Sequence, residues 1–156
     1  EQFRARETGK TYLALVLGDW PERLKVIDAP LHKYLLPDGE RRVKAVAEGD
    51  PDGMRSITLV KVRQRLRGYT LLEVTIKTGR THQIRVHLAA QGHPIAGDDK
   101  YGDFERNKAL HKQGLRRMYL HAWRLQFTHP TSGARIEVLA PLPSDLIAFA
   151  TPNPHP

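Results

Sequence analysis

The chain has 156 residues and no cysteine, which excludes disulfide bonds and thiolate metal sites. It carries 25 Lys and Arg against 17 Asp and Glu, and the resulting net charge of +8 favours a polyanion, RNA or DNA, as the partner. No apolar run approaches the ~20 residues that span a membrane, so we expect no membrane partner.

The first half of the chain is rich in predicted strands. Residues 11–17 form a compact apolar run with strand character. Residues 22–56 are polar and interrupted by Gly and Pro, which predicts short strands and loops. Two further strands are predicted at residues 57–66 and 69–76, joined by a turn at Gly68. Apolar and polar residues alternate in the second of them, as in a half-buried antiparallel strand.

The second half adds helices. We expect one helix at residues 82–91 and a polar helix at about 103–112. Residues 118–127 and 134–139 flank a turn sequence and predict a β-hairpin, and a short helix at 144–150 closes the chain. Strands with inserted helices predict an α+β fold with a mostly antiparallel sheet.

The start of the chain suggests a longer protein. The first residue is not Met, and residues 1–6 resemble the last turns of a helix whose start is missing. Thr8 and Gly9 would then be the C-terminal stop of that helix. We therefore expect residues 1–156 to be the later part of one domain.

The stretch GRTHQIRVHL, residues 79–88, combines a helix start with unexpected charge. Thr81 is the expected N-cap. Arg80 adds a positive charge where an anion could sit, although a well-capped helix explains the same residues. Arg85 lies at the edge of the apolar stripe of the helix, where a charge must be paired or it is costly.

Four basic residues alternate along the strand predicted at 57–66 and just beyond it. The alternation predicts that all four side chains leave the same face. They form either a solvated edge that resists aggregation or a ribbon that contacts phosphates with a strong salt dependence. The four residues are Lys61, Arg63, Arg65 and Arg67.

Histidines and paired acids invite a metal interpretation that the spacing does not support. His82, His87 and His93 are five and six residues apart, unlike the i, i+4 pair of zinc enzymes, and we expect no metal. Asp98 and Asp99 lie in a Gly-flanked loop, where adjacent acids usually make turn hydrogen bonds and local ion pairs.

Three blocks of the sequence together resemble the RluA-type pseudouridine synthases. They are GKTYLALV at 9–16, GRTHQIRVH at 79–87, and GHPIAGD followed by KYG within 92–102. Residues 120–122 and 127–130 also agree. The resemblance is closest to members that modify ribosomal RNA of the large subunit. It implies the catalytic-domain fold of that family and isomerisation of uridine to pseudouridine in 23S ribosomal RNA, with no cofactor. A cytoplasmic monomer is expected.

The resemblance also assigns roles to individual residues. Arg85 is implied to pair with an aspartate nucleophile that family members carry upstream in an H-R-L-D block. Tyr12 corresponds to the tyrosine that packs on the target base and helps with proton removal. The RNA-contacting residues implied or expected are Lys10, Arg80, His82, Gln83, Lys61, Arg63, Arg65 and Arg67.

No H-R-L-D block occurs in these 156 residues. We therefore expect the chain to be inactive by itself and Arg85 to be exposed to solvent without an internal partner. The alternative is a non-catalytic RNA-binding module that keeps the charge and the fold. A nuclease or other hydrolase would need a clustered acid or metal site, which the sequence does not show.

Overall fold

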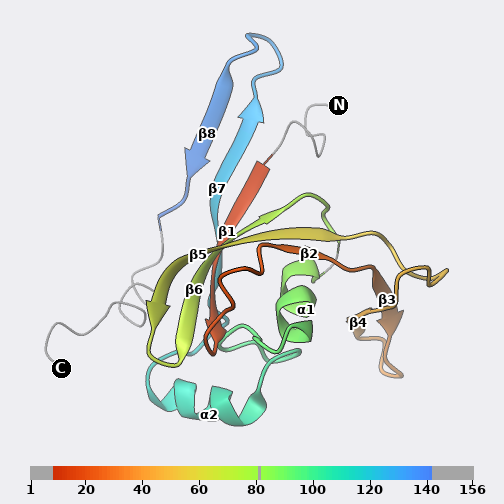
Figure 1. The fold of residues 1–156 in the computed structure, drawn as a ribbon, viewed down its shortest axis with the longest axis vertical. Coiled ribbons are helices and arrows are strands. Elements are labelled where there is room, and N and C mark those ends of the chain that lie inside the picture. The colour runs from red at the N-terminus through yellow and green to blue at the C-terminus, as the bar shows by residue number, and fades with distance from the viewer. Residues whose placement is uncertain (1–8, 81, 142–156) are drawn as a thin grey trace, which may run out of the picture.

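The computed structural model describes residues 9–80 and 82–141. A six-stranded antiparallel sheet forms its centre, in the strand order β2-β5-β6-β1-β7-β8, and strands β3 and β4 form a separate hairpin (Figure 1). The elements are β1 (Gly9–Leu17), β2 (Val26–Asp28), β3 (Leu31–Leu35), β4 (Arg41–Ala45), β5 (Ile57–Leu66), β6 (Tyr69–Ile76), α1 (Gln83–Ala90), α2 (Phe104–Lys112), β7 (Leu120–Thr128) and β8 (Arg135–Leu139).

This arrangement confirms the predicted α+β fold with an antiparallel sheet. The strands expected at 57–66 and 69–76 are β5 and β6, and Gly68 between them has φ +81°, which glycine adopts without strain. The helices predicted at 1–6 and 144–150 lie outside the described residues. Thr8, the first residue of the expected helix stop, also lies outside the described residues. Gly9, the second residue of that stop, begins β1.

Alternation along β1 divides the core into two layers. Leu13, Leu15 and Leu17 point to one face of the sheet and pack in the same cluster as Leu110 of α2. Ala14, on the opposite side of the strand, packs with Leu88 of α1. Since successive strand residues point to opposite faces, the two helices cover opposite faces of the sheet.

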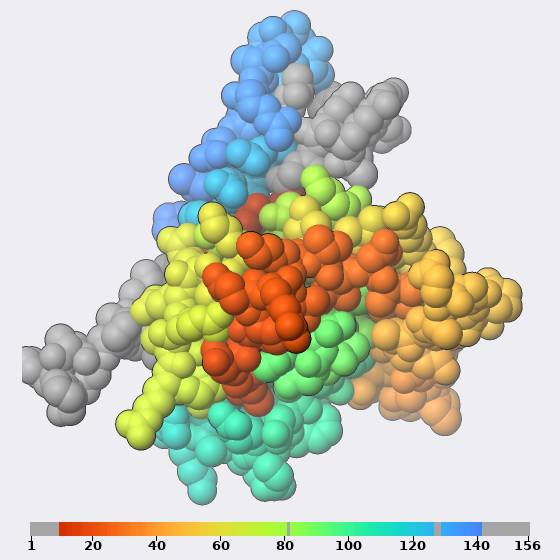
Figure 2. Space-filling view, in the orientation of Figure 1, coloured from red at the N-terminus to blue at the C-terminus, as the bar shows by residue number. Residues whose placement is uncertain are grey.

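The two helices differ in how deeply they are enclosed. The β3–β4 hairpin projects from the side of the molecule (Figure 2) and packs against α1 through Leu31, Val43 and Val86. With the sheet on one side and the hairpin on another, α1 buries five of its eight residues, polar Gln83 among them. In α2 only Leu110 is buried. The residues before and within α1 are therefore held from several directions.

The expectation that the basic residues 61–67 share one face is wrong. A β-bulge interrupts the pairing of β5 with β6 at Arg63. The Arg63 guanidinium lies 4.9 Å from the Trp123 ring, on the α2 side of the sheet. Arg65 donates instead to the carbonyl oxygen of Trp20, on the α1 side. The extra residue in a bulge reverses the alternation, so the run divides between the two faces.

Candidate functional site

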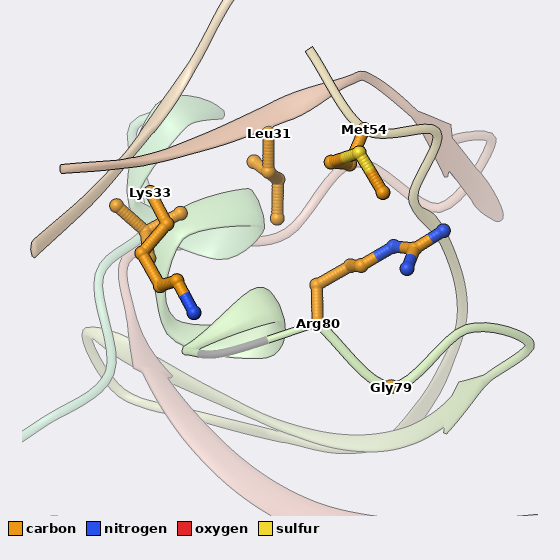
Figure 3. A pocket seen from close by; sticks show the side chains of 6 residues that line it. Leu31, Lys33, Met54, Gly79 and Arg80 are labelled. Atoms are coloured by element: carbon orange, nitrogen blue, oxygen red, sulfur yellow. The ribbon is translucent and has the colours of Figure 1, made fainter. Parts of the chain in front are cut away.

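The loop before α1 has an unusual backbone. The helix begins at Gln83 and its N-cap residue is His82, whose side chain makes no capping hydrogen bond, so the expected cap at Thr81 is wrong; position 81 itself lies outside the described residues. His82 has φ +52°, a left-handed conformation that costs energy for a residue other than glycine. Just before it, Gly79 and Arg80 line a pocket (Figure 3).

Gln83 holds this loop from inside the protein. Its amide oxygen accepts from the Thr78 hydroxyl at 2.6 Å and from the Arg80 N–H at 3.1 Å. Its amide nitrogen donates to the Ile57 carbonyl at 2.9 Å and to the Thr58 hydroxyl at 3.0 Å. Gln83 is only 3% exposed. From this interior position Gln83 shapes the loop, and its RNA contact stays a prediction.

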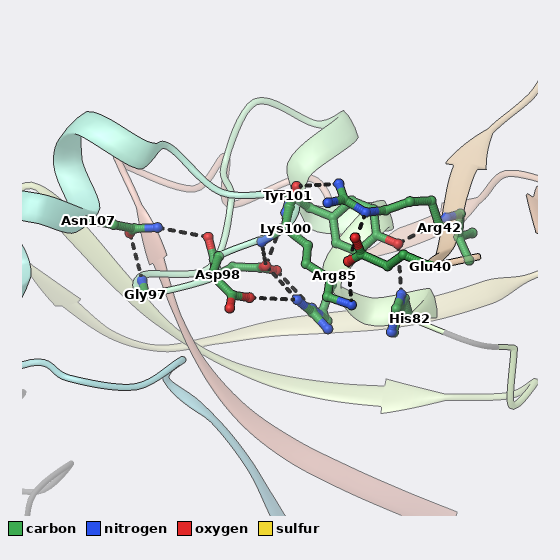
Figure 4. Close-up of polar contacts among 11 residues, drawn as sticks. Glu40, Arg42, His82, Arg85, Gly97, Asp98, Lys100, Tyr101 and Asn107 are labelled. Carbon is green, nitrogen blue, oxygen red and sulfur yellow. Dashed lines mark hydrogen bonds and ion pairs between the residues drawn. The ribbon is translucent and has the colours of Figure 1, made fainter. Parts of the chain in front are cut away.

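Arg85 has a partner within the chain. Its Nε and Nη2 donate to the two carboxylate oxygens of Asp98 at 2.9 and 2.7 Å (Figure 4). The Arg85 side chain is 13% exposed and that of Asp98 is 1% exposed. The exposed Asp99 adds a second, longer contact of 3.6 Å to Nη2. The expectation of a solvent-exposed Arg85 without an internal partner is therefore wrong.

Asp98 is also held by the turn that follows it. Its Oδ1 accepts from the N–H groups of Lys100 at 2.9 Å and Tyr101 at 3.0 Å, which confirms the turn role expected for this acid. Burial opposes ionisation of Asp98, but the hydrogen bonds from Arg85 and from the two N–H groups lower its pKa overall. The bond to Asp98 in turn raises the pKa of Arg85. A buried carboxylate with four donors is a structural partner rather than a free nucleophile.

Helix α2 fixes the loop that carries Asp98. The Asn107 side chain accepts from the Gly97 N–H at 2.9 Å and donates to the Asp98 carbonyl at 2.7 Å. Gly97 has φ +84°, and a Cβ there would collide with the Arg117 carbonyl. Position 97 therefore requires glycine. The orientation of Arg85 thus depends on a helix on the other face of the sheet.

Tyr101 connects Arg85 to the hairpin and to the strained loop. The Arg85 guanidinium lies 5.1 Å from the centre of the Tyr101 ring. The Tyr101 hydroxyl accepts from the Val43 N–H at 2.9 Å and lies 2.7 Å from Nδ1 of His82. The hydroxyl keeps its own proton and a second lone pair, so it either donates to Nδ1 or accepts from an Nδ1–H of His82. Burial, followed by the positive charges of Arg85 and Lys100, lowers the pKa of His82, so its ring is neutral near pH 7.

Tyr12 lies on the same face of the sheet as α1. It is half-buried at the start of β1 and packs against the core cluster that includes Ile84 and Leu88. That Tyr12 and Arg85 face one cleft stays a prediction, and so do their chemical roles.

The remaining predicted RNA contacts differ in how free they are. Lys10, Lys61, Arg67 and Arg80 are exposed. Arg65 is bound to both Asp19 and Glu22. Arg63 lies 3.3 Å from Glu73 and also stacks on Trp123.

Several side chains in this network were not expected from the sequence as site residues. They include Tyr101, Asn107 and Arg42, whose guanidinium lies 5.8 Å from the Tyr101 ring. The KYG block within the resemblance is the one signal that marks Tyr101. The pair of Arg85 with Asp98 joins a helix to a loop 13 residues later, a distance at which no local pattern operates.

Two further observations concern the described residues as a whole. Among residues 9–80 and 82–141, no group of three His, Asp or Glu side chains is placed to hold a metal ion. None of the helices in this part of the chain has the length and apolar character needed to cross a membrane.

Sequence comparison adds named relatives to this geometry. Residues 1–90 match the family model described as RNA pseudouridylate synthase. "Ribosomal large subunit pseudouridine synthase C" of Yersinia pestis is 46% identical over 146 residues, which are 94% of this chain and 44% of that protein. The protein of the same name from Escherichia coli K12 is 46% identical over 148 residues, 45% of its length. The chain thus spans less than half of these curated relatives.

Solved structures with a similar fold also carry the name of this family. "Human RNA Pseudouridylate Synthase Domain Containing 1" superposes with a TM-score of 0.70 at 30% identity, covering 88% of this chain and 56% of the human one. The human protein titled "Domain Containing 4" of the same series superposes with a TM-score of 0.68 at 25% identity.

Proposed function

Because this chain belongs to the RNA pseudouridylate synthase family, we propose that it forms the later part of a catalytic domain that isomerises uridine to pseudouridine in large-subunit ribosomal RNA. The names of the relatives supply the reaction and the RNA. The net charge of +8 supports a nucleic-acid substrate. The nucleophilic aspartate of this proposal comes from a segment upstream of the 156 residues.

The observation that carries the proposal is the way in which Asp98 fixes the Arg85 guanidinium. Two of its nitrogens are committed to the buried Asp98, while Nη1 has no hydrogen-bond partner among residues 9–80 and 82–141. A guanidinium fixed on one edge offers its other edge in a defined direction, without loss of further rotamer freedom. We propose that Nη1 receives the carboxylate of the nucleophile, orients it and keeps it ionised.

The reaction itself needs a base taken out of the RNA stack. In the proposed mechanism the ionised aspartate attacks the ribose carbon of the flipped uridine and displaces the uracil, so the bond from ribose to the uracil nitrogen breaks. The detached uracil turns, and one of its ring carbons attacks the same ribose carbon and releases the aspartate. The proton on that ring carbon then leaves, and the freed nitrogen takes up a proton. Tyr12, which packs against the α1 residues of the core, is proposed to stack on the base and to assist this proton removal.

The RNA backbone is proposed to follow the exposed basic residues. Lys10 and Arg80 are exposed, and His82 adds a neutral imidazole ring. Lys61, Arg63 and Arg67 contribute from β5 and its turn, whereas Arg65 is engaged by acids of this chain. We further propose a cytoplasmic monomer that works without cofactor or metal.

The test joins this chain to the coding sequence upstream of it and supplies unmodified large-subunit ribosomal RNA. Pseudouridine is read by carbodiimide labelling and primer extension. We expect the longer protein to form pseudouridine, the 156-residue chain to form none, and Arg85→Gln in the longer protein to abolish the product while RNA binding persists.

Two results would contradict the proposal. Pseudouridine formed by the 156-residue chain alone would place the nucleophile within it. RNA binding without product by the longer protein, under conditions in which the Escherichia coli relative is active, would favour the non-catalytic RNA-binding module.

A further inference from the structure

A pocket separate from Arg85 lies between the β3–β4 hairpin and the loop before α1 (Figure 3). It encloses about 250 Å³. Pockets for drug-sized ligands span roughly 300–1,000 Å³, so this one suits a single small group rather than a folded partner. Its lining residues are Leu31, Lys33, Val43, Met54, Gly79 and Arg80.

One side of the pocket is apolar. Leu31 and Val43 are buried at 2% and 4% exposure, whereas Met54 is 53% exposed. Methionine is flexible and polarizable and adapts to the shape of a ligand. A mobile thioether above two fixed aliphatic side chains provides a surface on which a flat ring can pack.

The other sides carry positive charge without a counter-charge. Lys33 and Arg80 flank the pocket from two different elements, and no acidic residue lines it (Figure 3). Within the described residues, neither cation forms an ion pair. The Arg80 Nε donates to the Arg55 carbonyl at 3.1 Å, which fixes the side chain and leaves both terminal nitrogens for a ligand. Two unpaired cations predict an anionic occupant.

The face of the β3–β4 hairpin that lines the pocket carries further apolar and cationic side chains beyond it. The strand register pairs Lys33 with Val43 and Leu35 with Arg41, so these four side chains share a face. Leu35 is 66% exposed and Arg41 is also exposed. Apolar and cationic groups therefore follow one another away from the pocket. A single nucleic-acid strand offers the complement, with flat bases joined by phosphates.

We propose that this pocket binds one unpaired nucleotide of the RNA, with its phosphate on Lys33 and Arg80 and its base against Met54. The inference rests on the proposed RNA substrate. The nucleotide concerned is an anchoring one beside the target uridine rather than the target itself. Its binding requires no chemistry at Arg85 and can be measured separately from isomerisation.

Methionine-methyl NMR of the 156-residue chain tests the base contact directly. The chain has two methionines, Met54 in the pocket and Met118 packed against the core. We expect a ten-nucleotide oligouridylate to shift the Met54 methyl signal and to leave that of Met118 unchanged. Gly79→Leu should remove the shift. A Cβ at Gly79 meets nothing within 4 Å, so the backbone accepts a side chain that starts toward the pocket.

Salt titration of oligouridylate binding tests the phosphate contact. Each neutralised phosphate of a single strand contributes about 0.7 to the slope of log K against log salt. Since Lys33 and Arg80 share one phosphate in this proposal, Lys33→Ala with Arg80→Ala should reduce that slope by about 0.7. The matched control removes two exposed charges elsewhere. It combines Lys44→Ala, on the opposite face of the hairpin, with Arg23→Ala, and should leave the slope nearly unchanged.

The outcomes separate this inference from the proposed function. Oligouridylate binding with an unmoved Met54 signal overturns the pocket, even if the longer protein isomerises uridine. A Met54 shift with uridine 5′-monophosphate but not with the oligonucleotide overturns RNA as the occupant. An equal shift with inorganic phosphate overturns the base contact. A Met54 shift with RNA in a protein that forms no pseudouridine supports the pocket and rejects the enzyme.

Discussion

Arg85 and Arg65 each contact two acidic side chains, yet their surroundings are opposite. Arg85 is 13% exposed and its principal partner, Asp98, is 1% exposed. Arg65 is 41% exposed, and its partners Asp19 and Glu22 are 86% and 73% exposed. Water competes for the hydrogen bonds of Arg65 and its two acids, whereas the pair of Arg85 with Asp98 is largely shielded from water. The count of ion pairs therefore says little about either residue, whereas burial decides which pair the fold depends on.

The largest expected effect follows from breaking the buried pair. Arg85→Met leaves Asp98 as a buried carboxylate without its cation, and such losses cost about 3–5 kcal/mol. The same substitution at Arg65 should cost less than about 1 kcal/mol, because exposed pairs contribute that little. Urea unfolding of the two variants of the 156-residue chain gives both values. Equal losses in the two variants would show that burial does not separate them.

The double substitution Arg85→Met with Asp98→Leu sharpens this comparison. Replacing both members of a buried pair with apolar residues removes the unpaired charge and often restores stability. We expect the double variant to be more stable than Arg85→Met alone. A double variant as unstable as the single one would mean that the backbone N–H groups of Lys100 and Tyr101 depend on the carboxylate more than Arg85 does.

A smaller effect is expected where α2 supports the buried pair from the far side of the sheet. Asn107→Ala removes two hydrogen bonds to the 97–98 backbone and leaves those groups poorly satisfied, at a cost of about 1–3 kcal/mol. Lys108→Ala is the control, since that neighbouring side chain is 74% exposed. An Asn107 variant as stable as its control would show that the loop holds Asp98 without help from α2.

The pH dependence of stability should come partly from a second buried group on α1. His87 is fully buried, with Nδ1 2.7 Å from the Thr58 hydroxyl and Nε2 2.9 Å from the Ala29 carbonyl. Burial lowers its pKa, so it stays neutral in the fold while the unfolded chain takes up a proton below about pH 6.5. Stability must therefore fall as the pH falls through that value.

His87→Gln tests this assignment because the amide keeps a donor and an acceptor but does not titrate. Urea unfolding at pH 7.5 and 5.5 should show a smaller difference for the variant than for the unmodified chain. An unchanged difference would assign the loss to other groups, such as His82, whose pKa is also lowered by burial. Asp98 contributes separately, because a carboxylate with a lowered pKa loses its stabilising effect only in more acidic solution.

Local sequence patterns predicted much of the fold. The strand at 57–66 was predicted with its observed bounds, because apolar alternation and the Gly68 turn act within a few residues. The polar helix α2 was predicted in the same way, and its N-cap Asp103 accepts from the Arg106 N–H at 3.0 Å.

Local sequence patterns could not predict contacts between residues that are far apart in the chain. The bulge at Arg63 depends on how β6 pairs, and the burial of Gln83 depends on partners on β5. The pair of Arg85 with Asp98 is set by how a loop returns over the helix. The sequence therefore located the site through a family resemblance, while its internal partners emerged only from packing.

The smallest expected effect compares two neighbours at one end of β5. Arg65 and Arg67 carry the same charge, but the acids bound to Arg65 already neutralise much of it, while Arg67 is exposed beside the Gly68 turn. For binding of a single-stranded RNA, Arg67→Ala should reduce the slope of log K against log salt by about 0.7 if it meets one phosphate, whereas Arg65→Ala should change it less.

The triple variant Arg65→Ala with Asp19→Asn and Glu22→Gln removes the acids as well, and its affinity should exceed that of Arg65→Ala because two repelling charges are gone. Equal slopes for the two single variants would show that RNA displaces Asp19 and Glu22 from Arg65, and β5 would then present both arginines to the RNA.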